Sequence, residues 1–364
     1  MANFHSLQIK DLRREGIDAV SILFEIPNEL NDVFSFSQGQ YITLRAKVNG
    51  EELRRSYSIC SSPFSSDLRV LIKQIADGKF STFANTVLNE GAYIDVMPPM
   101  GNFFTELLQD NKKKYTAFAA GSGITPIISI IRATLKVEDG SHFTLFYGNK
   151  TQQSTLFYKE LEDLKKQYFN RFEIHYVMSE VSGLDEKFTG RLNSEKCTLY
   201  QNQILDFTTE DEIFLCGPEN MIFDIKDYLI EIGVTDKAIH FELFTTTKQK
   251  DENKIESSSN SLPINSDIEL IIDGDSFHFN LAEDGDTILD AAMAVDADVP
   301  FACKGGVCCA CKAKVIKGKV KMDVNYALDE DEVEEGFVLT CQSHPISTKV
   351  LKCSTVIESP RFNS

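Results

Sequence analysis

The sequence predicts a multidomain protein in which an antiparallel β-barrel, an α/β domain with a parallel sheet, and a small α+β domain follow one another. Three observations favour this fold class. A chain of 364 residues suits two or three domains, because a domain usually holds about 100–200 residues. Near residue 114 the hydrophobic pattern changes from short alternating segments to segments of strand and helix type. A polar stretch at 245–266 then leads to a region with clustered cysteines.

The barrel is predicted from short segments in which polar and apolar residues alternate. Turn-forming pairs such as Asn49-Gly50 and Asp77-Gly78 separate these segments, as is typical of antiparallel sheets. The expected strands cover 19–26, 41–48, 55–60, 68–75 and 92–97, and a helix is expected over 82–89.

The α/β domain is predicted from alternation of apolar strands with amphipathic helices, which favours a parallel sheet covered by helices. Expected strands are 115–120, 143–147, 171–178 and 212–216, and expected helices are 126–135, 156–167 and 221–232. The domain boundaries we expect are 1–105 for the barrel, 106–245 for the α/β domain, 246–265 for a flexible linker and 266–364 for the α+β domain.

Charge and composition exclude several classes of function. The net charge of -18 argues against nucleic acid or an anionic membrane as partner. The most apolar segment, 117–135, is interrupted by glycine, proline and arginine and cannot span a membrane. The N-terminus shows no export signal, and with nine cysteines the sequence predicts a reducing, cytoplasmic location.

The cysteines of the α+β domain follow the pattern C-x4-C-x2-C, with a fourth cysteine 29 residues further on. This is the spacing of a plant-type ferredoxin (β-grasp) loop that holds a 2Fe-2S cluster on four thiolates. The predicted ligands are Cys303, Cys308, Cys311 and Cys341. A structural zinc site would show paired C-x2-C motifs, and a disulfide framework would need an oxidising compartment. Cys309 fits none of the four positions, so we expect it to pack as a small side chain near the cluster.

Two segments of the barrel suit a flavin. A flavin needs a cation for its phosphate, a flat ring against the isoalloxazine and a donor near N5, which Arg55, Tyr57 and Ser58 can supply. Because residues alternate along a strand, Ser58 faces away from the other two, and we expect it to act partly through its amide. Further on, Gly78-Lys79-Phe80-Ser81 precedes the expected helix and can cradle a pyrophosphate. Ser81 could also be an ordinary N-cap.

Two glycine-containing turns of the α/β domain suit a nucleotide. In Gly121-Ser122-Gly123-Ile124-Thr125-Pro126, Thr125 can cap the helix, Pro126 suits its first turn, and the glycines admit a pyrophosphate. By itself such a turn more often has no ligand. A second turn, Cys216-Gly217-Pro218, also ends a strand and favours a nucleotide site; the alternative for Cys216 is a buried core thiol.

Arg55-Ser56-Tyr57-Ser58 followed by the Gly78–Ser81 segment resembles the ferredoxin-NADP reductase superfamily, in which these residues bind FAD, or FMN in a minority. The resemblance implies that the two glycine-containing turns flank the nicotinamide, with Cys216 near its reactive carbon. It also implies that the closing segment 240–244 brings Glu242 near the flavin edge. The turn after strand 143–147 has one cation and no acid, so we expect NADPH, with Lys150 and Arg191 facing its 2′-phosphate.

The order of these motifs over the whole chain most resembles the family of phenylacetyl-CoA epoxidase reductase subunits. The resemblance implies an enzyme that passes electrons from NADPH through FAD and the cluster to a separate di-iron oxygenase component, and it implies Ser58, Cys216 and Glu242 as catalytic residues. Reductases of ketosteroid hydroxylases and ring-hydroxylating dioxygenases share the same motifs. Two alternatives are therefore an enzyme that uses FMN or NADH and a ferredoxin-type carrier without turnover.

Overall fold

The computed structural model describes residues 4–183, 185–244, 265–272, 274–347 and 351–355. The chain folds into two compact units, one formed by His5–Leu243 and the other by Met1–Phe4 together with Phe244–Ser364. The expected linker, 246–265, lies outside the described residues except for Asn265, which begins a strand. Within the described residues, no helix combines the length and the apolar character that a membrane span requires.

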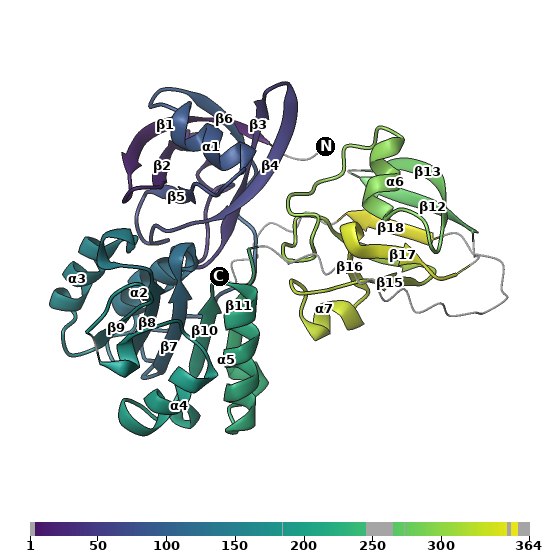
Figure 1. Ribbon diagram of the computed structural model, residues 1–364. Helices are drawn as coiled ribbons and strands as arrows, with labels where there is room; N and C mark the ends of the chain where they lie inside the picture. The colour runs from purple at the N-terminus through teal and green to yellow at the C-terminus, as the bar shows by residue number, and fades with distance from the viewer. Residues whose placement is uncertain (1–3, 184, 245–264, 273, 348–350, 356–364) are drawn as a thin grey trace. The chain divides into compact units, whose positions relative to one another are not determined.

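The first part of the N-terminal unit is a barrel of six antiparallel strands in the order β4-β3-β6-β1-β2-β5 (Figure 1). A bridge between Ile59 and Val70 joins the ends of the two edge strands and closes the sheet. The elements are β1 (His5–Arg14), β2 (Ala19–Glu25), a 3-10 turn η1 (Asn28–Leu30), β3 (Tyr41–Val48), β4 (Glu51–Ser58), β5 (Leu68–Lys73), α1 (Lys79–Thr86) and β6 (Tyr93–Val96).

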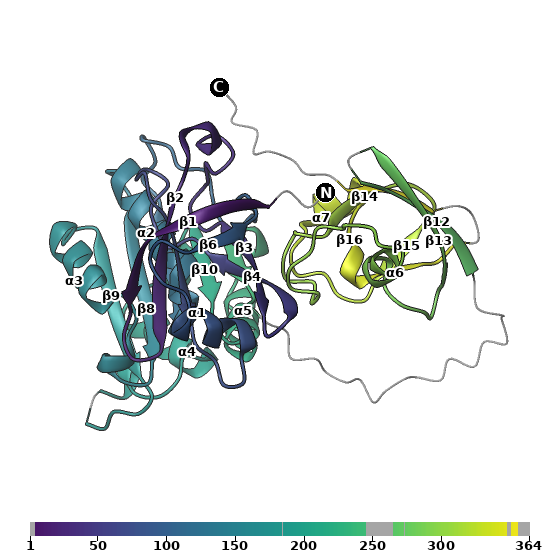
Figure 2. The same ribbon diagram turned by 90° about the horizontal axis from the view of Figure 1, so that it is seen from above.

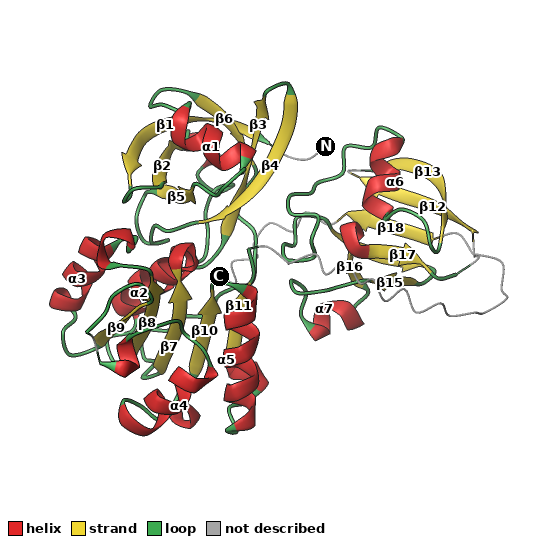
Figure 3. Cartoon of the chain, viewed as in Figure 1, coloured by secondary structure: helices red, strands yellow, loops and turns green. Residues whose placement is uncertain are grey.

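The second part of this unit is a five-stranded parallel sheet in the order β11-β10-β7-β8-β9, with helices on both faces (Figure 3). The helices are α2 (Ile124–Val137), α3 (Tyr158–Gln167), α4 (Ser194–Gln203) and α5 (Glu219–Glu231). The strands are β7 (Lys114–Ala120), β8 (His142–Asn149), β9 (Phe172–Met178), β10 (Glu212–Cys216) and β11 (Ile239–Glu242). Single turns of 3-10 helix connect them: η2 (Gly121–Gly123), η3 (Gln152–Ser154), η4 (Glu186–Phe188), η5 (Phe207–Thr209) and η6 (Asp236–Ala238).

Alternation along the strands divides the core into two faces. Odd-numbered residues such as Tyr115 and Tyr147 pack against α2 and α3 in one buried cluster. On the opposite face, the Phe146 ring stacks on Tyr200 of α4 with 4.4 Å between ring centroids. Figures 1 and 2 both show α3 alongside the edge strand β9.

The barrel and the parallel sheet share one buried interface. Ala19 and Leu71 of the barrel belong to the same apolar cluster as helix α2. Polar contacts also cross the interface: the buried Ser129 Oγ donates to the Ser61 carbonyl over 2.6 Å, and the partly buried Arg132 donates to the Cys60 carbonyl over 2.7 Å. These contacts fix the carboxyl ends of the parallel strands relative to β4, and the residues expected to hold the flavin and the nucleotide lie on those elements.

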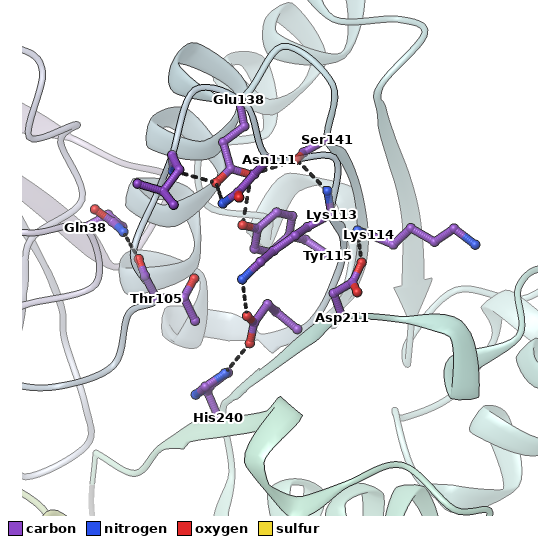
Figure 4. Close-up of polar contacts among 12 residues, drawn as sticks. Gln38, Thr105, Asn111, Lys113, Lys114, Tyr115, Glu138, Ser141, Asp211 and His240 are labelled. Carbon is purple, nitrogen blue, oxygen red and sulfur yellow. Dashed lines mark hydrogen bonds and ion pairs between the residues drawn. The ribbon is translucent and has the colours of Figure 1, made fainter.

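A buried carboxylate anchors the connection between the barrel and the sheet (Figure 4). Glu138 is fully buried and accepts hydrogen bonds from the Tyr115 hydroxyl at 2.9 Å, Ser141 Oγ at 2.7 Å, Asn111 Nδ2 at 2.7 Å and the Leu108 amide at 3.2 Å. A buried charge is stable only when its oxygens are satisfied in this way. The connector that leads into β7 is thus held to the end of α2.

The C-terminal unit has a five-stranded mixed sheet in the order β13-β12-β18-β14-β16 and a two-stranded ribbon of β15 and β17. In β12, every second residue from Ser266 to Ile272 is buried, the pattern of a half-buried strand. The elements are β12 (Asn265–Ile272), β13 (Asp275–Ala282), α6 (Ile288–Ala294), β14 (Lys312–Lys317), β15 (Val320–Met322), α7 (Glu330–Glu334), β16 (Phe337–Leu339), η7 (Thr340–Gln342), β17 (Ser343–Pro345) and β18 (Leu351–Thr355). The predicted fold class is therefore confirmed in all three parts.

Candidate flavin, nucleotide and iron–sulfur sites

Strand β4 presents the residues expected at the flavin. Arg55 is exposed, and no ion pair joins it to a carboxylate among the residues that the structure describes, so its charge is available to a phosphate. The Tyr57 ring lies 5.8 Å from the Phe80 ring of α1, and burial raises the pKa of its phenol. Ser56 exchanges a hydrogen bond of 3.0 Å with Thr43 on β3. These side chains fit the phosphate and the ring system of a flavin.

Ser58 differs from the sequence-based expectation because its hydroxyl, and not only its amide, has a specific partner. Ser58 Oγ donates a hydrogen bond of 3.0 Å to Glu242 Oε2. Glu242 is half-buried at the end of β11, directly beside Cys216 in the register of β10 and β11. Burial raises the pKa of Glu242 to about 8. The three residues expected to be catalytic thus come together from three strands.

Cys216 is fully buried, and its pKa is raised, first by burial and then by the neighbouring carboxylate of Glu242. The thiol is therefore neutral over the physiological range and cannot act as a thiolate nucleophile. It offers a soft, small surface and a weak S–H donor at the carboxyl end of β10.

The segment Gly78–Ser81 forms the start of α1, which begins three residues earlier than expected and ends at Thr86. Its first intrahelical bond joins the Thr82 amide to the Gly78 carbonyl over 2.9 Å, so the amides before Thr82 make no such bond and suit a pyrophosphate. Ser81 is not the N-cap; its hydroxyl donates to the Gly78 carbonyl over 3.2 Å. Lys79 is exposed and pairs with Glu51.

Gly78 has a packing reason to be glycine. A Cβ added there would lie 2.4 Å from Ile75 Cγ1 and 2.4 Å from Ser81 Oγ. Phe80, expected as part of the cradle, is buried in the core of the barrel and supports the Tyr57 ring.

The two glycine-containing turns of the α/β domain are in direct contact. A Cβ on Gly123 would lie 2.1 Å from the Cys216 carbonyl oxygen, and one on Gly217 would lie 3.2 Å from Ala120 Cβ. Gly121 has a φ of +55°, and a Cβ there would meet nothing within 4 Å. The space beside Gly121 therefore admits a ligand, whereas Gly123 and Gly217 allow the two turns to pack together.

The expectation that Thr125 caps the helix was wrong. Helix α2 begins at Ile124 after Gly123, and Thr125 and Pro126 both lie within its first turn. The Thr125 hydroxyl donates to the Ser122 carbonyl over 2.9 Å and stabilises the preceding 3-10 turn. Pro126 suits its position because the first turn needs no backbone donor. Pro218 precedes α5 as its N-cap residue.

Lys150 and Arg191 are both exposed near the carboxyl ends of β8 and β9. Lys150 Nζ lies 3.2 Å from Glu180 Oε1, and both side chains are largely exposed. The turn after β8 was expected to contain no acid, but tertiary contact supplies one from the segment after β9. No ion pair joins Arg191 to a carboxylate in the described parts of the chain.

A cavity of about 520 Å³ lies at the edge strand β9. Its lining consists of Gln152, Gln153, Tyr158, Ile174, His175, Tyr176, Met178, Val181 and Phe188. The His175 ring stacks against Phe188 with 5.7 Å between centroids. The sequence reasoning missed this cavity, because aromatic residues on a strand are the usual sign of a core.

The four expected cluster ligands converge in the C-terminal unit. Cys308 Sγ lies 3.1 Å from Cys303 Sγ, and hydrogen bonding between side chains also links Cys341 to Cys303 and Cys311. Cys303 is half-buried, whereas Cys308, Cys311 and Cys341 are 4%, 1% and 4% exposed. Four converging thiols fit a 2Fe-2S cluster, which divides them between two irons.

Backbone amides surround these sulfurs. The Gly305 amide donates to Cys303 Sγ over 3.3 Å. Hydrogen bonds from Cys308 and Cys341, followed by those from backbone amides, lower the pKa of Cys303. Hydrogen bonds to sulfur stabilise the thiolate that a metal requires. Within the described ranges, no three or more His, Cys, Asp or Glu side chains are arranged so that they could together hold a single metal ion.

Cys309 packs in the core of the C-terminal unit, as expected for a small side chain near the cluster. It is 7% exposed, and its thiol donates to the Ala327 carbonyl over 3.0 Å. Burial raises the pKa of Cys309 to about 12, so it remains a thiol.

Comparison with known families agrees with this organisation. Residues 7–105 match the oxidoreductase FAD-binding domain, residues 118–227 the oxidoreductase NAD-binding domain and residues 270–345 the 2Fe-2S iron-sulfur cluster binding domain. The solved structure of phthalate dioxygenase reductase has the same fold: it covers 96% of this chain and 98% of its own, with a TM-score of 0.56 and 21% identity.

These domains, in this order, define an oxidoreductase for electron transfer that combines FAD, a nicotinamide nucleotide and a 2Fe-2S cluster. The chain is 40% identical over 353 residues to one of the subunits of 1,2-phenylacetyl-CoA epoxidase of Escherichia coli (strain K12), covering 96% of this chain and 98% of that protein. It is 30% identical over 346 residues to the ferredoxin reductase component of 3-ketosteroid-9-alpha-monooxygenase of Rhodococcus rhodochrous, covering 94% of each. The chain belongs to the family of oxygenase reductase components that includes these two proteins.

Proposed function

We propose that this protein takes electrons from NADPH and delivers them to the oxygenase component of a phenylacetyl-CoA epoxidase. The observation that carries the proposal is the convergence of Ser58, Cys216 and Glu242 within the unit that holds the nucleotide turns, combined with four cysteines arranged for a cluster on the same chain. The 40% identity to the epoxidase protein supports this oxygenase over the ketosteroid one, at 30%.

A bound flavin supplies hydride acceptance, and a bound 2Fe-2S cluster supplies transfer of single electrons. The chain's own residues position these groups. Arg55 and the first amides of α1 would bind the flavin phosphates, with Ser56, Lys79 and Ser81 shaping this part of the site, and Tyr57 would cover the ring. The Phe80 ring packs against the Tyr57 ring and supports it.

The nucleotide would lie along the carboxyl ends of the parallel strands, where ligands bind in sheets of this type. The space beside Gly121 and the first turn of α2 would take its pyrophosphate. Cys216-Gly217-Pro218 would place the nicotinamide against Ser58 and Glu242, since β10 and β11 end together there. Hydride transfer requires the two reacting atoms at about 3–3.5 Å.

Lys150 and Arg191 support NADPH as the coenzyme, because both are exposed cations near the carboxyl ends of β8 and β9. One observation favours NADH as a second candidate: Glu180 pairs with Lys150, and a carboxylate can hold the ribose diol of NADH. The cavity's aromatic lining suits the adenine of either coenzyme.

We further propose a cytoplasmic location. Four of the nine cysteines are the proposed cluster ligands, and the other five form no disulfide, which supports a reducing compartment.

Anaerobic stopped-flow absorbance, with NADPH and NADH mixed separately with the purified protein, tests the proposed path. We expect rapid bleaching of the flavin bands followed by slower loss of the cluster absorption, and faster bleaching with NADPH. Flavin bleaching without cluster reduction would contradict the electron path. Addition of the epoxidase oxygenase component should then reoxidise the cluster, whereas a ketosteroid oxygenase component should not.

A further inference from the structure

Lys304 has an unusual backbone conformation in the cluster loop. Its φ is +53°, in the left-handed region that residues with a Cβ rarely adopt. A residue with a Cβ is strained in this region, because the Cβ approaches the following carbonyl oxygen. Glycine would relieve this strain, and two glycines follow directly in the loop. A lysine at this position therefore needs a compensating role for its side chain.

The side chain of Lys304 is held at two points. Its ammonium lies 2.7 Å from Asp290 Oδ1 of α6 and 4.9 Å from the centroid of the Phe301 ring. The backbone carbonyl of Lys304 accepts a hydrogen bond of 3.2 Å from Gln342 Nε2, and Gln342 follows the ligand Cys341. Contacts to a carboxylate, a ring and a neighbouring loop fix where the positive charge lies.

Lys304 is adjacent in the chain to the ligand of the cluster site that is nearest to solvent. Lys304 directly follows Cys303, which is the half-buried member of the four ligands. Helix α6, which carries Asp290, also packs against the turn η7 that contains Cys341. The cation is therefore carried by the residue after one ligand, and the anion is carried by a helix that packs against the turn holding another ligand.

We propose that Lys304 and Asp290 shift the reduction potential of the cluster in opposite directions, with the lysine raising it and the aspartate lowering it. Reduction adds one electron, supplied by the reduced flavin, and therefore one unit of negative charge to the cluster. A fixed cation nearby stabilises that charge and a fixed anion destabilises it. Lys304 and Asp290 are 40% and 47% exposed, so salt should weaken both effects. The inference rests on the proposed cluster being bound.

The test is an anaerobic redox titration of the full-length protein with its cluster, followed by electron paramagnetic resonance of the reduced state. The variants are Lys304→Gln, Asp290→Asn and the double variant, with Lys304→Arg retaining the charge. We expect a lower potential for Lys304→Gln, a higher one for Asp290→Asn, a value near the parent protein for the double variant, and little shift for Lys304→Arg. Each shift should shrink at high salt.

Lys317→Gln is a matched control, because it removes the same charge at the far end of β14. That position is about 16 Å along the strand from Lys312, which follows the ligand Cys311. It should shift the potential much less than Lys304→Gln.

A purely structural role predicts a different result. If the pair only anchors α6 to the loop, both single variants disturb the same contact and shift the potential in the same direction, or not at all. Either result would overturn the inference. Iron and sulfide analysis of each variant distinguishes this failure from a failure of the proposed function, since a parent protein without cluster signals would remove the premise itself.

Discussion

Ser58 Oγ donates a hydrogen bond of 3.0 Å to Glu242 Oε2, although the two residues are 184 positions apart in the chain. Ser58 ends a strand of the barrel, and Glu242 ends the last strand of the parallel sheet. The bond therefore joins the two parts of the unit at the point where flavin and nicotinamide are proposed to meet.

Replacement of Ser58 by alanine should slow flavin reduction by NADPH about 100-fold, because it removes a positioned donor at the reacting centre. Stopped-flow absorbance in the flavin band would measure this rate. Ser65→Ala is the control, since that exposed serine donates only to the Ser62 carbonyl of its own turn. A loss of flavin from the Ser58→Ala protein, without a change in rate when flavin is restored, would assign Ser58 to binding instead.

Glu242 should make flavin reduction pH-dependent. Burial raises its pKa to about 8, so the carboxyl is neutral below this pH and negative above it. Hydride transfer adds negative charge to the acceptor, which a neighbouring anion opposes. The rate should fall as pH rises through about 8, and Glu242→Gln should remove this step.

The same shift gives a prediction for stability. In the unfolded state the pKa of Glu242 has its ordinary value of 4.5. Between this pKa and the raised one, the folded state therefore holds a proton that the unfolded state has released. The stabilisation of the folded state by this proton is complete below the ordinary pKa and is lost as the pH rises to about 8. Thermal unfolding from pH 5 to 8 should therefore depend less steeply on pH in Glu242→Gln than in the parent protein. An unchanged slope would mean that Glu242 is already ionised at pH 5.

Serine in place of Cys303, Cys308, Cys311 or Cys341 should abolish or severely reduce cluster content, whereas Cys309→Ser should keep it. A serine hydroxyl at 309 can still donate to the Ala327 carbonyl, so we expect a cost of about 1 kcal/mol in unfolding free energy. Iron and sulfide analysis with visible absorption would measure the content. Zinc in place of iron in the parent protein would instead identify a structural metal site.

Lys150→Gln and Arg191→Gln should each raise the KM for NADPH about 10-fold and leave that for NADH nearly unchanged, because a charged hydrogen bond to phosphate contributes about 1.5–3 kcal/mol. Steady-state reduction of ferricyanide measures both values. Glu180→Gln provides the opposing test. If that variant weakens NADH use and the two cation variants do not affect NADPH, the enzyme prefers NADH.

Glu138→Ala should lower the unfolding free energy by about 3 kcal/mol, since it leaves the buried hydroxyls of Tyr115 and Ser141 without their acceptor. The donors labelled in Figure 4 come from the connector (Asn111), from β7 (Tyr115) and from the loop between α2 and β8 (Ser141). Urea unfolding followed by flavin fluorescence would measure the change. Asp139→Ala is the matched control, because that side chain is 89% exposed. Equal effects of the two variants would indicate that the network contributes little.

The sequence by itself determined the fold class and the chemistry of the cluster. Alternation at period two, turn pairs and the change of pattern near residue 114 are local signals, and they predicted strands such as β3 with the bounds that the structure has. The spacing of Cys303, Cys308 and Cys311 is also local, because a short loop can present three thiols only if they lie close in sequence.

Tertiary structure decided what depends on contacts between distant segments. The Ser58 hydroxyl has its partner on β11, the Glu180 carboxylate reaches Lys150 from the segment after β9, and the cavity at β9 is lined by residues whose pattern is typical of a core. The first turns of α1 and α2 also differed from expectation, because packing at Gly78 and Gly123 set their starts. Local sequence specifies backbone preference and residue chemistry, but the raised pKa of Glu242 arises from desolvation, which only the assembled fold produces.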